Sequence, residues 1–233
     1  VPIENTFFLE DFKKLLNKDM KKYGFITENL KFLNDLSHIV SQVRVPEQIL
    51  LELKWLKENY SYNYHHVVAV TALSSRMARD FLEGQELVDT AEAAILYDIG
   101  IGHIPSKIIQ KVGKLDPKER NIVSYHPIYS VLLMAHYYQD YKHPRIEIVL
   151  NHHENLNGTG YPRKIKNSNM ISQIIHLADT FDALISARPD RRFFTTLEAF
   201  KICEEEINQG KIAREILPII YSYYLFINEY PYE

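Results

Sequence analysis

Several histidines and aspartates of this 233-residue chain stand in apolar or helix-terminal contexts. They are His66, Asp98, His126, His152, His153 and Asp179. A buried carboxylate is costly unless it is paired, hydrogen-bonded or bound to a cation. Asp98 follows Ile-Leu-Tyr and Asp179 follows Ile-Ile-His-Leu-Ala, so both raise this question. Imidazoles and carboxylates converging from several helices are the ingredients of a metal site.

Each of these residues also has a structural explanation when taken singly. A lone histidine on a helix is more often a satisfied core or surface group than a ligand, and Asp179 could pair with an arginine. The doublet His65-His66 shows that paired histidines also occur at solvated helix ends. We assign structural roles to five further histidines: His38, His103, His136, His143 and His176.

The elements that must position these residues are predicted to be helices. Glycine is scarce at 8 residues, and no sustained alternation of apolar and polar residues indicates a strand. The spacing predicts helices over 47–59 and 170–186, and Thr195 to Glu198 forms a capping box. The fold class is therefore all-α.

Two further helix boundaries follow from capping signals. Asp89 or Thr90 is predicted to cap a helix that Gly100 stops. Asp116-Pro117-Lys118-Glu119 predicts an N-terminus, from which one helix should run past His126 to about Tyr138.

Composition restricts the classes of function. The 27 basic residues against 30 acidic ones give a net charge of -3, without the basic balance of a duplex-binding protein. The single cysteine, Cys203, excludes an intramolecular disulfide and fits a reducing compartment. No apolar stretch is long enough to span a bilayer. The chain starts at Val1, so a removed leader stays open.

The segment from His152 to Pro162, HHENLNGTGYP, favours the metal site. It resembles the HH-E-x-x-[DN]-G-x-G-Y-P signature of the HD-GYP family, a branch of the HD phosphohydrolases. The resemblance is collinear over about 64–200. It includes H-x-x-x-V at His66, Y-D-I-G at 97–100, I-P and K-V-G-K-L at 104–115, H-P at His126, and A-D-x-x-D-A-L with R-P at 178–189.

The resemblance implies a fold, a set of ligands and a chemistry. It implies an HD-type helical bundle with a binuclear centre held by His66, Asp98, His126, His152, His153 and Asp179. Asp98 would bridge the ions and serve catalysis, and Arg188 and Arg191 would hold substrate phosphates. Two ions can activate water and clamp both oxygens of an in-line displacement on phosphorus. Imidazole and carboxylate donors without thiolate favour iron, otherwise manganese.

The chain also departs from the family pattern. Tyr97 replaces the histidine of the H-D pair, so one ligand is lost or replaced by a phenol. Ile101 replaces the usual lysine after H-D-I-G, and Asp190 replaces the tyrosine of R-P-Y-R. Tyr62 stands where trinuclear members carry a glutamate, which argues against a third metal.

The predicted function is hydrolysis of cyclic di-GMP to linear pGpG or GMP in a bacterial cytoplasm. The alternatives are a metal-containing effector without turnover, an HD-type nucleotidase acting on mononucleotides, and a structural role without metal. The resemblance implies cyclase (GGDEF) partners at the loop 160–162 and no duplex nucleic acid. Residues 1–60 are predicted to be a helical regulatory or dimerising segment, and 61–233 the phosphohydrolase domain.

Overall fold

The computed structural model describes residues 1–18, 23, 30–186 and 193–222. Its helices, in chain order, are η1 (Ile3–Asn5), α1 (Phe7–Lys18), α3 (Leu30–Ser41), α4 (Glu47–Asn59), α5 (Ser61–Ala78), α6 (Gln85–Leu96), η2 (Ile99–His103), α7 (Ser106–Ile109), α8 (Pro117–Val123), α9 (His126–Tyr138), α10 (Arg145–Leu150), α11 (Met170–Ile185), α12 (Thr196–Asn208) and η3 (Arg214–Ile216). Within these ranges there is no strand, only an isolated bridge between Pro2 and Arg44, so the predicted all-α class is confirmed. None of these helices is long and apolar enough to cross a bilayer.

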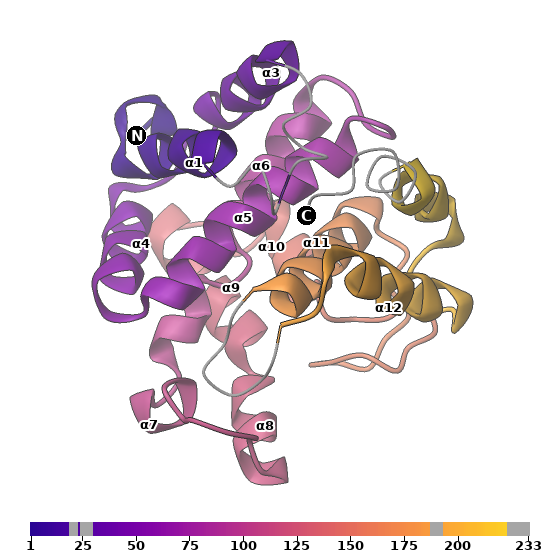
Figure 1. The fold of residues 1–233 in the computed structure, drawn as a ribbon. Helices are drawn as coiled ribbons and strands as arrows, with labels where there is room; N and C mark the ends of the chain where they lie inside the picture. The colour runs from indigo at the N-terminus through magenta and orange to yellow at the C-terminus, as the bar shows by residue number, and fades with distance from the viewer. Residues whose placement is uncertain (19–22, 24–29, 187–192, 223–233) are drawn as a thin grey trace.

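Helix α5 lies in the middle of the bundle (Figure 1). It packs against α6, α11 and α4, and the N-terminal helices α1 and α3 also contact it. Thirteen of its residues are buried, as a central helix requires. The hydrophobic core is continuous from Ile3 in η1 to Ile220 near the end of the described chain. The predicted boundary at residue 60 thus falls within one packed core, and the assignment of separate roles on its two sides stays a prediction.

Capping residues set the local boundaries of several helices. Asp116 and Thr195 each form the predicted capping box, with their side chains accepting from the third helical N–H. Helix α4 has the predicted bounds, with Pro46 before its first turn. The expected N-cap at Asp89 or Thr90 is wrong, because α6 already begins at Gln85 after Gly84. Thr90 instead bonds back to the Glu86 carbonyl at 2.8 Å, as a threonine inside a helix can.

The helix expected from Asp116 to Tyr138 is interrupted at residues 124–125, which separate α8 from α9. Pro127 has no N–H with which to continue the backbone ladder to Val123. The Val123 carbonyl faces Nδ1 of His126 at 2.8 Å instead. The interruption therefore turns His126 toward the core at the first position of α9.

Candidate metal centre

The six predicted ligands converge from five segments onto one buried cluster. His66 comes from α5, Asp98 from the turn after α6, His126 from the start of α9, the pair His152-His153 from the end of α10, and Asp179 from α11. Four of them are at most 6% exposed, namely His66, Asp98, His126 and His152. His153 and Asp179 are partly buried and line a cavity of about 420 Å³.

Helix ends and turns bring these side chains together. Gly100, two residues after Asp98, leaves no room for a Cβ against the backbone of His126 and Ser130. The Ser130 hydroxyl accepts from the Gly100 N–H and donates to the Tyr97 carbonyl, both at 2.9 Å. This close approach brings Asp98 to the N-terminus of α9, where its carboxylate lies 3.4 Å from Nε2 of His126.

The loop after His153 is held by a buried carboxylate. Glu154 accepts backbone N–H bonds from Arg163, Lys164 and Ile165. Gly160 lies so close to the backbone of residues 153–155 that no Cβ would fit. The loop therefore folds back over the cluster, and the Tyr161 ring stacks on the His153 ring with centroids 4.5 Å apart.

The rings of His126 and His152 face each other through their Nε2 atoms. Each Nδ1 points at a backbone carbonyl, that of Val123 at 2.8 Å and that of Val149 at 2.6 Å. Their Nε2 atoms are then directed at each other across 3.1 Å. Burial and the nearby His126 lower the pKa of His152 to about 3, so its ring is neutral at pH 7. With both Nδ1 atoms donating, the facing Nε2 atoms are the positions from which histidines bind metals.

His66 lies between two carboxylates. Its Nδ1 is 2.6 Å from Asp182 and its Nε2 is 2.8 Å from Asp179. Burial lowers the pKa of His66, but the hydrogen bonds to both carboxylates outweigh it and raise that pKa well above the usual value. For Asp179, burial alone would raise the pKa. The hydrogen bond from His66 outweighs burial, so the pKa of Asp179 lies below its ordinary value. A carboxylate on the far nitrogen is how metal-binding histidines are usually oriented.

These donors fit a metal cation. The ring nitrogens of His126, His152 and His153 lie within 4.8 Å of one another, a spacing that could hold a metal ion. A proton shared between the facing Nε2 atoms of His126 and His152 would require a buried imidazolium. A cation bound by both satisfies both lone pairs and balances the carboxylates of Asp98 and Asp179.

Three residues that depart from the family pattern also adjoin the cluster. The Tyr97 side chain is fully buried, and its hydroxyl donates to Asp179 Oδ1 at 3.2 Å. Burial and the Asp179 carboxylate raise the pKa of Tyr97 well above 10, so the phenol keeps its proton. Tyr62 stacks on the His66 ring at 5.9 Å, and Ile101 lines the cavity. Arg188, Arg191 and Asp190 lie outside the described residues.

Two residues beside the clustered side chains were not predicted from the sequence to belong to the site. Asp182 orients His66, and its position three residues after Asp179 on one helix face was the available signal. His176, three residues before Asp179, is buried with its ring centroid 6.0 Å from that of His153. Nothing in the structure contradicts its assignment as structural.

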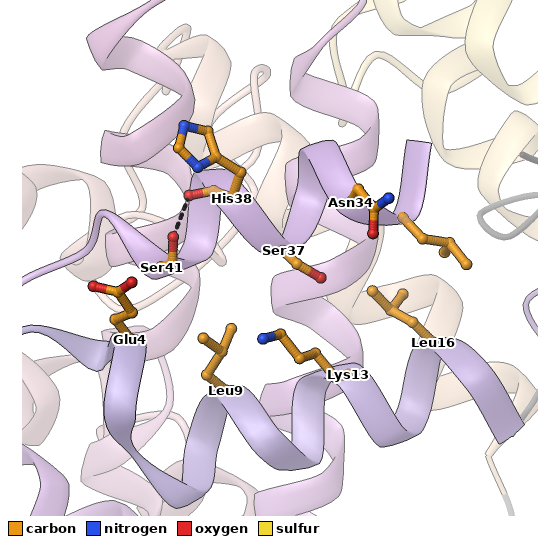
Figure 2. A pocket seen from close by; sticks show the side chains of 9 residues that line it. Glu4, Leu9, Lys13, Leu16, Asn34, Ser37, His38 and Ser41 are labelled. Atoms are coloured by element: carbon orange, nitrogen blue, oxygen red, sulfur yellow. Dashed lines mark hydrogen bonds between the residues drawn. The ribbon is translucent and has the colours of Figure 1, made fainter. Parts of the chain in front are cut away.

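A second cavity, of about 480 Å³, lies between α1 and α3 (Figure 2). Its lining mixes polar and apolar side chains, among them Lys13, Asn34 and Leu9. Ser41 donates to the His38 carbonyl at its edge at 2.7 Å. It contains none of the clustered imidazoles and carboxylates, so the candidate metal donors adjoin the first cavity only.

Comparisons with known proteins identify the family of this chain. Residues 44–216 match the family described as HD domain. The chain is 33% identical over 155 residues to a cyclic di-GMP phosphodiesterase of Pseudomonas aeruginosa, covering 65% of this chain and 37% of that protein. It is 30% identical over 211 residues to a cyclic di-GMP phosphodiesterase of Thermotoga maritima, covering 89% and 54%. The chain therefore spans about half or less of the length of these relatives.

A third relative differs in substrate name. It is a 3'3'-cGAMP-specific phosphodiesterase of Vibrio cholerae, 29% identical over 180 residues, with 74% of this chain and 41% of that protein covered. Among solved structures, Bd1817, an HDG"Y"P protein from Bdellovibrio bacteriovorus, matches 91% of this chain and 63% of its own. Its TM-score is 0.55 at 21% identity, which supports the fold alone.

This chain belongs to the HD domain family of helical proteins. Within that family it is a divergent member of the HD-GYP branch, as the loop from His152 to Pro162 and the relatives indicate.

Proposed function

We propose that this chain is a metal-dependent phosphodiesterase that hydrolyses cyclic di-GMP or a related cyclic dinucleotide to its linear form or to mononucleotides. One observation carries the proposal: the buried nitrogens of His126 and His152 face each other at 3.1 Å within the cluster. The names of the relatives support the substrate class, since cyclic di-GMP and 3'3'-cGAMP phosphodiesterases are both among them.

We propose two transition-metal ions, iron or otherwise manganese, as the cofactor. The donors are imidazoles and carboxylates without a thiolate, a set that suits these metals. The ligands would be the six clustered residues, His66, Asp98, His126, His152, His153 and Asp179. Asp98 would hold metal and serve catalysis, on the basis of its place in the family motif.

The metals, when bound, would supply positive charge to the phosphoryl oxygens and make water nucleophilic near neutral pH. The chain's own residues would do the remaining work. Tyr97 holds one oxygen of Asp179 with its hydroxyl, and Tyr161 fixes the ring plane of His153 by stacking. Both restrict ligand side chains to one orientation before substrate arrives.

Substrate would enter through the cavity of about 420 Å³ beside the cluster. Ile101, Ile108 and Leu115 form an apolar part of its wall, which suits the faces of purine bases and excludes water. Lys111 also lines it, with Nζ bonded to Glu119 at 2.6 Å. We propose Lys111 as a cation for substrate phosphate, and retain Arg188 and Arg191 from the family motif in the same role.

We propose that cyclase partners contact the loop 160–162. The proposed location of the protein is the cytoplasm. Tyr161 supports a coupling between such a contact and the site, because its ring stacks on His153. A partner that shifted this loop would also shift a metal ligand.

A second candidate function is that of a metal-containing effector that binds a cyclic dinucleotide without turnover. It is favoured by Tyr97, whose hydroxyl bonds Asp179 where the family motif has a metal-binding histidine. It is also favoured by Ile101, which places an apolar side chain on the cavity wall where the motif has a lysine.

A substrate panel distinguishes these functions. Protein loaded anaerobically with iron or manganese would be incubated with cyclic di-GMP, 3'3'-cGAMP and GMP, and products separated by chromatography. We expect linear dinucleotide or GMP from at least one cyclic dinucleotide. Phosphate release from GMP alone would indicate a nucleotidase, and tight binding of a cyclic dinucleotide without product would indicate the effector.

A further inference from the structure

Asp182 connects the metal centre to the N-terminal segment, defined here as the described residues 1–18, 23 and 30–41. This carboxylate is 1% exposed, and three side chains in the described part of the chain hydrogen-bond to it. His66 Nδ1 is 2.6 Å from one oxygen, and the Ser186 hydroxyl donates to the same oxygen at 3.0 Å. The third partner is the hydroxyl of Tyr23, which donates to the other oxygen although it lies 159 positions earlier in the chain.

Tyr23 reaches the centre because the N-terminal segment docks on α5, the helix that carries His66. Helix α1 packs on α5 and contributes Asp11, whose carboxylate accepts from Tyr64 at 2.8 Å and from Lys57 at 2.6 Å. The Tyr23 side chain itself is only 2% exposed. Its hydroxyl therefore bonds Asp182 in a buried environment, where a hydrogen bond to a charged group is strong.

Tyr23 acts on His66 through Asp182, because it bonds the carboxylate that orients the His66 ring. Asp182 accepts the Nδ1 proton of His66, which leaves Nε2 as the nitrogen that faces Asp179 and the cluster. A donor on the second oxygen of Asp182 fixes the plane of this carboxylate, and with it the orientation of the His66 ring. Mutation of a group that hydrogen-bonds a metal-binding histidine, as Asp182 does with His66, typically costs about 10- to 100-fold in metal affinity, and Tyr23 lies one hydrogen bond further out.

We propose that Tyr23 is a positioning residue of the metal centre, through which the docked N-terminal segment holds His66 in its metal-binding orientation. The inference rests on the proposed ligand role of His66. It gives the N-terminal segment a defined part in the site, since displacement of that segment removes a donor from Asp182 and weakens metal binding.

The test measures metal affinity and does not depend on turnover. Wild type, Tyr23→Phe and Tyr64→Phe would each be titrated with manganese, and free Mn²⁺ followed by electron paramagnetic resonance. Tyr64→Phe is the matched control, because it removes a buried hydroxyl bond between the same segment and α5 without touching Asp182. We expect Tyr23→Phe to lower the affinity for manganese about 10-fold at the weakest binding site that the titration resolves. Tyr64→Phe should leave this affinity unchanged.

A double-mutant cycle shows whether the effect passes through Asp182. Asp182→Asn should weaken manganese binding, and adding Tyr23→Phe to it should cause no further loss. Equal affinity of Tyr23→Phe and wild type would overturn the inference alone. Equal losses in Tyr23→Phe and Tyr64→Phe would also overturn it, because they would reflect docking in general. Absence of manganese binding by wild type would instead contradict the proposed metal centre itself.

Discussion

His126 and His152 present their Nε2 atoms to each other at 3.1 Å, while each Nδ1 faces a backbone carbonyl. The two carbonyls belong to Val123 and Val149, at the ends of α8 and α10. Carbonyls at helix ends lack intrahelical donors, and here the Nδ1–H groups of His126 and His152 provide them. Helix termination and ligand orientation are thus the same local feature at both positions.

The first prediction concerns metal-dependent stability. Manganese at 100 times its dissociation constant should stabilise wild type by about 2.7 kcal/mol, a rise in Tm of about 5–10 °C for a chain of this size. His126→Asn should lose most of this rise because it removes one of the facing nitrogens. His136→Asn is the matched control, since His136 is exposed on the same helix. Thermal unfolding with and without manganese measures both, and an undiminished rise in His126→Asn would contradict the assignment.

The second prediction concerns Tyr97, whose hydroxyl donates to Asp179. Tyr97→His should raise the number of ions retained per chain, because an imidazole adds a donor nitrogen where the phenol offers a proton. Elemental analysis after gel filtration measures this. Tyr97→Phe is the control, because it removes the hydroxyl without adding a ligand. If the histidine variant retains no more metal than the phenylalanine variant, the phenol is not what limits occupancy.

The helices and the six clustered residues could be predicted from sequence because both depend on local patterns. Apolar spacing and the caps at Asp116 and Thr195 gave correct helix starts, and the loop motif with the other collinear motifs indicated the residues that cluster. The break before His126 could have been anticipated from Pro127. The bond from Tyr23 to Asp182 could not, because a single tyrosine 159 positions away carries no motif and meets the site only through packing of the N-terminal segment.

A third prediction follows from Asp11, the carboxylate that joins α1 to α5. Burial raises its pKa, but hydrogen bonds from Lys57 and Tyr64 outweigh this, so the pKa lies below its ordinary value of 3.8. A lowered pKa stabilises the fold above the unfolded value, and this stability is lost as pH falls through the folded value. Asp11→Asn should therefore lower the free energy of unfolding by about 1 kcal/mol at pH 7. Urea unfolding should show the difference shrinking below about pH 4. A difference that grows on acidification would contradict the assignment.

The fourth prediction tests Lys111 as a phosphate-binding cation. Lys111→Met should raise KM about 10-fold with a smaller change in kcat, as expected when a binding charge is removed. Metal content should stay at the wild-type value, because Lys111 is not among the clustered ligands. Lys107→Met, at an exposed lysine of α7 outside the cavity lining, is the control. Steady-state kinetics with the best cyclic dinucleotide measures the pair, and equal KM values would remove Lys111 from the substrate site.

Metal-dependent hydrolysis of a cyclic dinucleotide is tested most directly by comparing wild type with Asp98→Ala, after both are loaded anaerobically with the same metal. Asp98 lies 3.4 Å from His126 in the cluster, so its removal should disable the centre while the helices persist. We predict that wild type converts cyclic di-GMP or 3'3'-cGAMP to linear product and that Asp98→Ala does so at least 100-fold more slowly, on the order of the loss of a key catalytic group. Wild type that retains its metal and leaves both cyclic dinucleotides intact would contradict it.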